Sequence, residues 1–435
     1  MRILFLSAYC PPYSYGGYEN RVRDITDQLA SRGHQVEVLT TRADKSLKVN
    51  PINFPYPVFR RLYGTRKALS WAERLTMKND TNRLGVVLVV LRQILRDLRD
   101  LRLIDQTIRA FQPDIVYLGN VLPLTHSLLP YLASISSPLV LDDGGKTMEI
   151  VYEDHGLWYR FLEEFGPSSA MLRSLKKLFT SLVTNISAGR LKSSWIWPEK
   201  INVIFNNNRS QKSFVLTNIP FNASKAVHSG LDLERFSFGP RQQPDQPLRI
   251  IVPGRIEPNK GQLDAVRLSA LLHQEGVDHL MAIVGDRWNE EYTNQLEAEI
   301  SKLGINDKVR IMPMQDKDSL IELYHQSDIC FFPSYHQTGF SRIPLEAMAC
   351  GCLMISYGNE GSGEIIRDGE NGFIVREGDM GFAKEIVMKL LHSSDVMTRV
   401  SLDARDYVER NHSMVIYVDQ IESFIAEIMR PEADR

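Results

Sequence analysis

Short apolar runs of strand length alternate with amphipathic stretches of helical period along most of the chain. In the first half the predicted strands lie at residues 2–8, 35–41, 114–120, 138–142 and 201–205. In the second half they lie at 248–254, 280–286, 308–314, 329–334, 352–358 and 373–375. Continuous apolar strands separated by helices are typical of parallel sheets covered on both faces. The pattern therefore predicts an α/β protein with two Rossmann-like halves.

The length and one polar segment indicate two domains. A chain of 435 residues is too long for one ordinary hydrophobic core. The stretch "FGPRQQPDQP" at 238–247 is rich in Pro and Gln and lacks apolar periodicity, which is typical of a linker. We therefore predict an N-terminal domain at 1–237 and a C-terminal domain at 248–411, with a ligand-binding cleft between them.

Composition and charge exclude several classes of function. The net charge of −2 gives no overall attraction to nucleic acid, so we expect no nucleic-acid partner. The longest apolar run, "VVLVVL" at 86–91, is far shorter than the ~20 residues of a membrane-spanning helix. The opening "MRILFLSA" indicates a first strand rather than a signal peptide. Four cysteines without a disulfide pattern indicate reduced core residues, and hence a cytoplasmic protein.

The stretch "CFFPSYHQTGFSRIPLEAMACGC" at 330–352 carries the strongest chemical signal. It joins the end of a strand, a glycine turn and the helix "IPLEAMAC". The N–H groups and the dipole of such a helix start suit a phosphate, and ligands bind at the carboxyl edge of a parallel sheet. Glu346 is then placed to hold two ribose hydroxyls, the alternative being a solvated surface acid. Its small apolar neighbours indicate burial, which favours binding because a buried carboxylate needs partners.

Two cations lie on the loop after the first strand of the second half. In "PGRIEPNKG", Arg255 and Lys260 are five residues apart around a turn with Gly and Pro. They are able to converge on a diphosphate, Arg as a planar fork and Lys as a point charge. Two unrelated surface cations are an equally common origin of such a pattern. The position at a first strand-to-helix loop favours binding.

The first half offers two weaker signals. In "AYCPPYSYGGYENRV", Gly16 and Gly17 follow the first strand and permit close approach of a ligand, but the spacing G-x-G-x-x-G of a dinucleotide site is absent. In "LVLDDGGKTMEI", Asp142 and Asp143 end a strand. Each suits a general base or a sugar-hydroxyl acceptor, and equally a cap for the next turn.

Together these segments resemble the retaining, nucleotide-sugar-dependent glycosyltransferases of the GT-B fold, specifically glycosyltransferase family 4. The resemblance rests on "PPYSYGGYENRVRDITDQLASRGHQVEVLTT", "KAVHSGLDLERF", "GRIEPNKG" and "PSYHQTGFSRIPLEAMACGCLMISYGNEGSGEIIRDGENGFIVREGD", in this order along nearly the whole chain. It implies two Rossmann-like domains whose parallel sheets face each other across a cleft. It also implies that a C-terminal helix at 412–435 packs back on the first domain.

The resemblance assigns roles to individual residues. Arg255 and Lys260 would neutralise the donor diphosphate as the catalytic cations, and Glu346 would hold the ribose. The other donor-binding residues would be Gly17, Met314, Gln315, Gly339, Phe340 and Ser341, the glycine loop and turn at the diphosphate and the pair 314–315 at the base. Asp142 falls near the acceptor and completes the catalytic set. No metal site and no cofactor is implied, because cationic side chains and helix ends take the role of Mg²⁺.

One position departs from the family pattern. The family has an acid eight positions before the second acid of its signature, where this chain has Thr338. In relatives that acid contacts hydroxyls of the donor sugar. A Thr hydroxyl still forms hydrogen bonds to a hydroxyl, so Thr338 is included among the donor-binding residues and the sugar preference is expected to differ.

The resemblance predicts transfer of a hexose-type sugar from a nucleotide-diphosphate sugar, such as a UDP-sugar, to a hydroxyl of a glycan or lipid-linked acceptor in polysaccharide biosynthesis. The alternatives are a GT-B sugar phosphorylase or epimerase, and a non-catalytic nucleotide-sugar-binding regulator. The basic region 59–109 includes Arg92, Arg96 and Arg99 in helical spacing beside an apolar face, which suits peripheral contact with the inner face of a membrane. Local pairing of these arginines with nearby aspartates is the alternative.

Overall fold

A computed structural model describes residues 1–13, 17–42, 52–64, 83–124, 127–145, 147–153, 159, 170–241 and 247–430. The chain forms two compact units. Unit 1 comprises Met1–Asn206, Ser210–Val227 and Gln420–Arg435, and unit 2 comprises Asn207–Arg209 and His228–Asp419. Among the helices so described, none is long and apolar enough to cross a bilayer.

Unit 1 is built on a parallel sheet of seven strands in the order β3-β2-β1-β4-β5-β6-β7. The strands are β1 (Arg2–Ser7), β2 (Gln35–Thr41), β3 (Val58–Leu62), β4 (Ile115–Leu118), β5 (Leu139–Asp143), β6 (Ile201–Phe205) and β7 (Ala223–Ala226). Strands β4, β5 and β6 are buried along their whole length and β1 is buried after Arg2, as expected for a parallel sheet covered on both faces.

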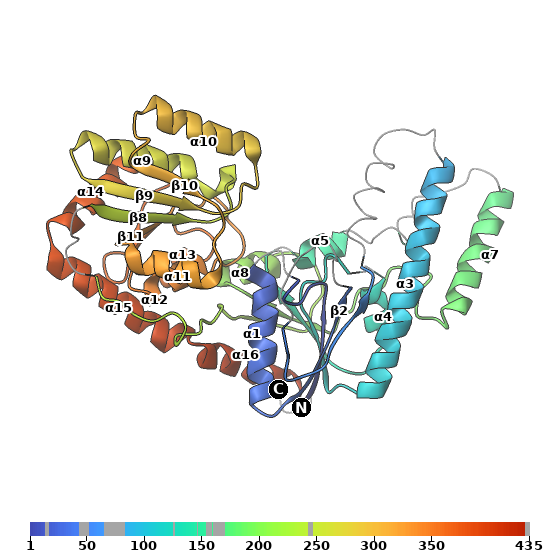
Figure 1. The fold of residues 1–435 in the computed structure, drawn as a ribbon. Helices are drawn as coiled ribbons and strands as arrows, with labels where there is room; N and C mark the ends of the chain where they lie inside the picture. The colour runs from blue at the N-terminus through green and yellow to red at the C-terminus, as the bar shows by residue number, and fades with distance from the viewer. Residues whose placement is uncertain are drawn as a thin grey trace. The chain divides into compact units, whose positions relative to one another are not determined.

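The helices of unit 1 are α1 (Gly17–Ser31), α3 (Arg83–Phe111), α4 (Leu128–Leu132), α5 (Thr147–Glu153), α7 (Ala170–Ile186) and α8 (Asn208–Val215), the last of which begins in unit 2. Most of them pack around this sheet, whereas α7 lies beside α3 and farther from the strands (Figure 1). Alternate residues of β1 show how a strand serves both faces. Leu4 and Leu6 join the core under α3, whereas Ile3 and Phe5 are buried on the other side of the strand.

Unit 2 is built on a parallel sheet of six strands in the order β10-β9-β8-β11-β12-β13. The strands are β8 (Leu248–Pro253), β9 (His279–Val284), β10 (Val309–Met312), β11 (Ile329–Phe332), β12 (Leu353–Ser356) and β13 (Phe373–Ile374). The order reverses direction at β8, because the chain builds outward from β8 to β10 and then returns to place β11 on the other side. Ligands bind at this kind of switch point in open α/β sheets.

Two separate cores cover the faces of the unit 2 sheet. Helices α9 (Gln262–Gln274), α10 (Glu290–Lys302) and α14 (Met380–Leu391) lie on one face, and α11 (Lys317–Gln326), α12 (Ile343–Ala349) and α13 (Ser362–Ile365) lie on the other (Figure 1). In β11, Ile329 and Phe331 enter the first core, while Cys330 and Phe332 enter the second. Helix α15 (Ser394–His412) packs on α12, and α16 (Met414–Ile428) passes from unit 2 into unit 1.

The predicted two-domain fold of parallel sheets is confirmed, and the strand predictions hold except for two that were missed, β3 and β7. The compact units part at residues 227 and 228, before the linker expected at 238–247. Residues 242–246 of that linker lie outside the described residues. Arg241 within it is buried and donates to the carbonyl oxygens of Ser327 and Tyr324 at 2.8 and 2.6 Å, which anchors this stretch to unit 2.

Candidate active site

Three loops meet at the carboxyl edge of the unit 2 sheet, where β8, β11 and β12 are neighbours. The loop after β8 carries the short 3-10 helix η1 (Pro258–Lys260), and the loop after β11 leads into α12. The backbone N–H of Tyr335 donates to the carbonyl of Asn259 at 2.8 Å, which joins these two loops. The amide of Asn359, in the loop after β12, donates to the carbonyl of Ser334 at 2.8 Å. The sheet order thus gathers segments about 100 residues apart in the chain.

Gly261 allows the close approach of the first two loops. Its φ of +70° lies in the left-handed region, and a Cβ there would lie 2.0 Å from the carbonyl oxygen of Pro333. Any side chain would therefore push the β8 loop away from the β11 loop. The glycine ends the segment "GRIEPNKG" for a reason of packing in addition to turn geometry.

The two predicted cations occupy different environments. The Arg255 side chain is half exposed, lies over the Trp288 ring at 5.1 Å and pairs with Glu257 at 3.1 Å. The Lys260 side chain is mostly buried and forms an ion pair with Glu360, a residue that sequence reasoning did not identify. Both cations are thus paired with an acid, but the exposed Arg255 is open to a ligand, whereas Lys260 is held in the interior.

Glu346 is buried on α12, as its small neighbours predicted, and the partner that a buried carboxylate requires is present. The Tyr324 hydroxyl donates to Oε2 of Glu346 at 3.4 Å. Burial is the largest cause that raises the pKa of Tyr324, so this phenol stays protonated and able to donate. The role of Glu346 in holding a ribose stays a prediction.

The turn between β11 and α12 differs in part from the expectation. The Ser341 N–H, predicted to face a diphosphate, donates to the carbonyl of Glu360 at 2.9 Å. The Gly339 carbonyl accepts from Nδ2 of Asn207 at 2.5 Å, and Phe340 packs so closely on Gly361 that a Cβ there would lie 2.3 Å from its ring. The turn is therefore held by the protein's own contacts, and the Ser341 N–H is already occupied. In the same turn, the hydroxyl of Thr338 lies 3.3 Å from Nε2 of His336.

Met314 and Gln315 follow β10, at the outer end of the sheet and separated from β8 by β9. Met314 is 65% exposed, and Gln315 donates to the carbonyl of Pro313 at 2.8 Å. Their predicted contact with a base stays a prediction. Gly17 is the first residue of α1 in unit 1, at the crossing from β1 that the sequence indicated, and its role is likewise untested.

Asp142 and Asp143 of β5 are both fully buried and have different structural roles. Asp143 accepts from the N–H groups of Gly145 at 2.6 Å and Met148 at 3.0 Å, which is the cap considered as the alternative. Asp142 forms an ion pair with Arg21 of α1 at 3.0 Å. Asp142 also accepts from the Tyr117 hydroxyl at 2.9 Å. An interior ion pair does not fit the acceptor-side role that we expected of Asp142, because the carboxylate is not accessible.

A second acid in unit 2 was not predicted. Glu364 of α13 accepts from the backbone N–H groups of Asn208 and Arg209, both at 2.9 Å, and pairs with His228 at 2.7 Å. Burial raises the pKa of Glu364, but these hydrogen bonds outweigh it and lower the pKa to about 2. Because residues 207–209 and 228 are remote in sequence, no local pattern announces this cluster.

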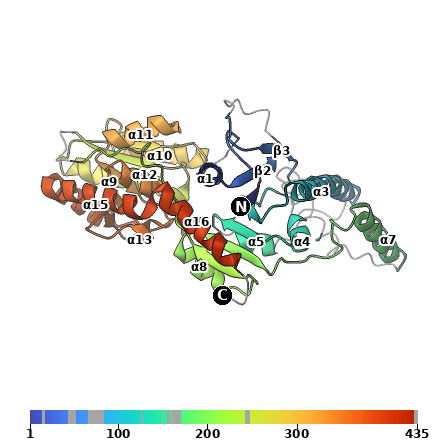
Figure 2. The same cartoon turned by 90° about the horizontal axis from the view of Figure 1, so that it is seen from below.

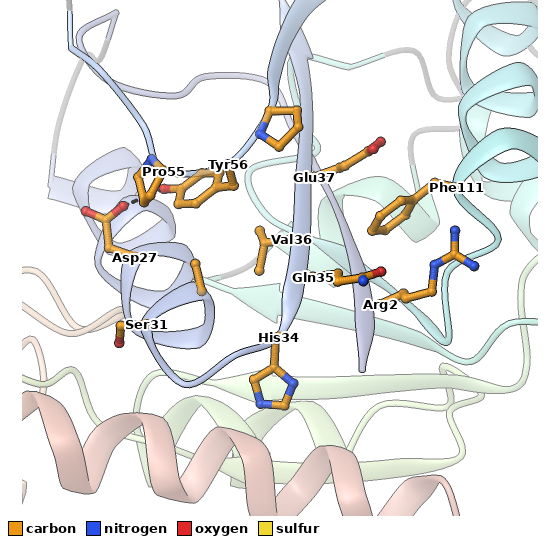
Figure 3. A pocket seen from close by; sticks show the side chains of 12 residues that line it. Arg2, Asp27, Ser31, His34, Gln35, Val36, Glu37, Pro55, Tyr56 and Phe111 are labelled. Carbon is orange, nitrogen blue, oxygen red and sulfur yellow. Dashed lines mark hydrogen bonds between the residues drawn. The ribbon is translucent and has the colours of Figure 1, made fainter.

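A cavity of about 590 Å³ lies in unit 1 at the amino ends of β1 and β2 (Figure 3). Its lining includes Asp27, Tyr56, Arg2 and Phe111. The Tyr56 hydroxyl donates to Asp27 at 2.6 Å, and the Arg2 guanidinium lies over the Phe111 ring at 5.0 Å. The cavity is at the opposite end of the strands from their carboxyl edge and contains none of the predicted site residues.

Within the described residues no cluster of three or more His, Cys, Asp or Glu side chains has a geometry that would hold a metal ion. All four cysteines are free and buried. The chemistry available at the carboxyl edge of unit 2 is that of cationic side chains beside hydrogen-bonding carboxylates.

Comparisons with known proteins agree with this architecture. The family model for Glycosyltransferase Family 4 matches residues 15–206, and that for Glycosyl transferases group 1 matches residues 234–407. The D-inositol 3-phosphate glycosyltransferase of Mycolicibacterium smegmatis is 30% identical over 173 residues, or 38% of this chain and 39% of that protein. The chain thus spans about two fifths of the length of the curated relatives that it matches.

Solved structures show the same fold over nearly the whole chain. A glycosyltransferase from Rickettsia africae has a TM-score of 0.64 at 18% identity and covers 99% of both chains. Anabaena HepE, solved with UDP-glucose, has a TM-score of 0.64 at 18% identity and covers 98% of this chain and 100% of its own. The fold is therefore GT-B. At the level of its two halves, residues 15–206 belong with Glycosyltransferase Family 4 and residues 234–407 with Glycosyl transferases group 1.

Proposed function

We propose that the protein transfers a hexose-type sugar from a nucleotide-diphosphate sugar to a hydroxyl of a glycan or lipid-linked acceptor, with retention of configuration and without a metal ion. The observation that carries the proposal is the convergence of the β8, β11 and β12 loops, which places Arg255, Lys260 and the helix of Glu346 at one edge of a parallel sheet. Loops at a switch point of this kind bind nucleotides and their phosphates.

The chemistry needs stabilised charge on the leaving diphosphate. As the glycosidic bond breaks, the sugar develops oxocarbenium character and the departing phosphate oxygen gains negative charge. The half-exposed guanidinium of Arg255 would donate hydrogen bonds to that oxygen, and the Lys260 ammonium, which pairs with Glu360 in the free protein, would supply a second positive charge. Glu346 would orient the nucleotide by accepting from hydroxyls of its ribose.

A thermal-shift panel of UDP, GDP, ADP and CMP with their common sugars tests this function. Stabilisation by one nucleotide family is expected, on the order of 3 kcal/mol at a hundred times the dissociation constant. Arg255→Ala and Glu346→Ala should each abolish it, while Arg249→Ala, an exposed cation at the start of β8, should not. The same panel in excess EDTA tests metal independence, and the anomeric configuration of the product by NMR tests retention. If none of the nucleotides or nucleotide sugars raises the melting temperature, the proposal is overturned and the phosphorylase or regulator is favoured.

We also propose that unit 1 contacts an anionic membrane surface through α3 and α7, which lie side by side in both views (Figures 1 and 2). Leu178, Leu182 and Ile186 of α7 are four residues apart and 54–68% exposed. Leu95 of α3 is 67% exposed. Exposed apolar side chains in helical spacing beside cations suit a lipid interface.

The charges of α3 favour this contact over the alternative of local pairing. Arg92, Arg99 and Arg102 are exposed and form no ion pair with a described carboxylate. The aspartates expected to pair with them point inward instead, with Asp97 and Asp100 3% and 2% exposed. Much of the basic region, including residues 65–82, lies outside the described residues.

Cosedimentation with vesicles tests the membrane proposal. The protein should bind phosphatidylglycerol-containing vesicles and not pure phosphatidylcholine, and binding should be lost on combined Leu178→Ser, Leu182→Ser and Ile186→Ser substitution. The matched control is Leu402→Ser with Phe382→Ser, two exposed apolar residues of unit 2. Equal binding by both sets of variants would refute it.

A further inference from the structure

Glu360 combines three features that its place in the sequence does not explain. Its φ of +50° lies in the left-handed region, which a non-glycine residue adopts at a cost in backbone free energy. Its side chain is only 6% exposed although it carries a charge. Its carboxylate lies at the meeting point of all three loops of the candidate site. Residues with strained backbones cluster at active sites and ligand clamps, so this acid is a candidate for a functional role.

The contacts of the carboxylate are one-sided. Lys260 Nζ and the Ser334 hydroxyl, the latter at 3.0 Å, both contact Oε1 of Glu360. Among the described residues no group donates to Oε2. A carboxylate accepts about four hydrogen bonds, so this one retains capacity for a ligand donor.

The backbone around Glu360 holds the side chain in place. The carbonyl of Glu360 accepts from the N–H of Ser341 at 2.9 Å, and the Asn359 amide donates to the Ser334 carbonyl and to Glu377, both at 2.8 Å. These contacts tie the strained residue to the loop before α12. The carboxylate is therefore fixed beside Lys260 and does not sample a free surface.

We propose that Glu360 is a specificity-determining residue. Its carboxylate balances the charge of Lys260 before the donor binds and then accepts a hydrogen bond from a hydroxyl of the donor sugar. The inference rests on the proposed function and names a contact within that same site. It follows that Glu360 favours the nucleotide sugar over the free nucleoside diphosphate. The terminal phosphate of a nucleoside diphosphate has a second pKa of about 6 and brings an additional negative charge to the carboxylate. The sugar instead brings hydroxyl groups, from which Oε2 is able to accept a hydrogen bond.

Isothermal titration of UDP against UDP-glucose, or of GDP against GDP-mannose if the panel selects guanine, tests the inference. For Glu360→Gln we expect the nucleoside diphosphate to bind tighter, on the order of tenfold, because a negative charge next to Lys260 is removed. The nucleotide sugar should change less than about threefold, since the lost repulsion is offset by a weaker acceptor. The preference for the sugar-bearing ligand should therefore collapse.

Two further variants keep the result interpretable. Glu360→Gly suits the left-handed backbone, so it should fold even if the Gln variant does not, and it should show the same collapse. Glu370→Gln removes an acid from the exposed surface of the same unit and should leave both affinities unchanged.

The outcomes separate this inference from the proposed function. If nucleotides bind to the wild type and are lost in Arg255→Ala, but Glu360→Gln and Glu360→Gly keep the wild-type preference, the role of Glu360 is overturned and the transferase proposal stands. Binding to the Glu360 variants alone would support the counter-ion role. If neither the wild type nor the Glu360 variants bind any nucleotide, both proposals are overturned.

Discussion

The buried pair of Arg21 and Asp142 allows a sharp test of whether Asp142 has a structural or a catalytic role. The two side chains are 4% and 0% exposed, and the contact is 3.0 Å long. Burial raises the pKa of the Asp142 carboxyl, despite the opposing effects of Arg21 and of the Tyr117 hydroxyl. The attraction between the charges therefore does not fully offset their removal from water, which is the usual situation for an interior ion pair.

The structure gives an order of magnitude for each substitution. Asp142→Leu leaves a buried guanidinium that cannot lose its proton, which should cost about 3–5 kcal/mol of unfolding free energy. Arg21→Met leaves a carboxylate that escapes its charge by taking up a proton, so it should cost less. Because the folded-state pKa of that carboxyl lies above its unfolded value, the penalty should shrink by up to ~1.4 kcal/mol for each pH unit as the pH falls. The double variant should cost about 0–1 kcal/mol, plus ~1–3 kcal/mol for the Tyr117 hydroxyl that loses its acceptor.

Urea unfolding followed by tryptophan fluorescence measures these energies. Trp288 is the one tryptophan of unit 2, so a Trp288→Phe background makes the signal specific to unit 1. Tyr117→Phe in the double variant checks the hydroxyl contribution. Additive penalties in the double variant would refute the buried-pair reasoning. If Asp142→Asn kept full stability but abolished sugar transfer, Asp142 would be the catalytic residue that the sequence suggested.

Three further predictions concern packing, pH and thiol chemistry. Gly261→Ala should destabilise the protein by about 3 kcal/mol, because its Cβ would overlap the Pro333 carbonyl. The control Gly276→Ala, at a similar φ of +76° but with open space around it, should cost about 1 kcal/mol, and equal melting temperatures of the two variants would contradict this. Glu364→Gln should lower the unfolding free energy above about pH 5. Because the folded-state pKa of Glu364 is depressed to about 2, the difference from wild type should vanish as the pH falls from about 4.5 toward 2. A difference in denaturant titrations that does not change with pH would argue against this prediction. Ellman's reagent should label none of the four cysteines in the native protein and all four after unfolding, since burial raises the pKa of each thiol, and rapid native labelling would show that a core is open.

The strands of both sheets were predictable because each buried parallel strand is a continuous apolar run. Gln35–Thr41 and Ile201–Phe205 begin and end where the hydrophobic pattern does. The two missed strands, β3 and β7, are the outermost strands of the unit 1 sheet, and their side chains are less buried than those of the central strands. Val58–Leu62 contains two arginines and Ala223–Ala226 is small and polar, so neither shows the pattern of a buried strand.

The candidate site was only partly predictable for a different reason. Arg255, Lys260 and Glu346 lie in local motifs, so their residue types and spacing could be interpreted directly. Glu360 lies 100 positions after Lys260, and their pairing arises from the strand order that makes β8, β11 and β12 neighbours. Charge balance at this edge is a property of the tertiary fold. For the same reason the pattern of two adjacent acids could not show that Asp142 is paired with Arg21 in the interior.

Helix α16 has a consequence for the synthesis of the protein. Its residues Ile421, Phe424 and Ile425 are 0–2% exposed within unit 1, and Glu422 forms ion pairs with Arg32 and His34. Unit 1 therefore includes residues that the ribosome adds only after the whole of His228–Asp419 has been translated. At ~5–20 residues per second that delay is on the order of ten seconds or more, during which the first sheet lacks part of its cover. All residues of unit 2 have been translated before Gln420 is added, so unit 2 is able to fold first. Until α16 is complete, unit 1 exposes apolar surface to which a chaperone would bind.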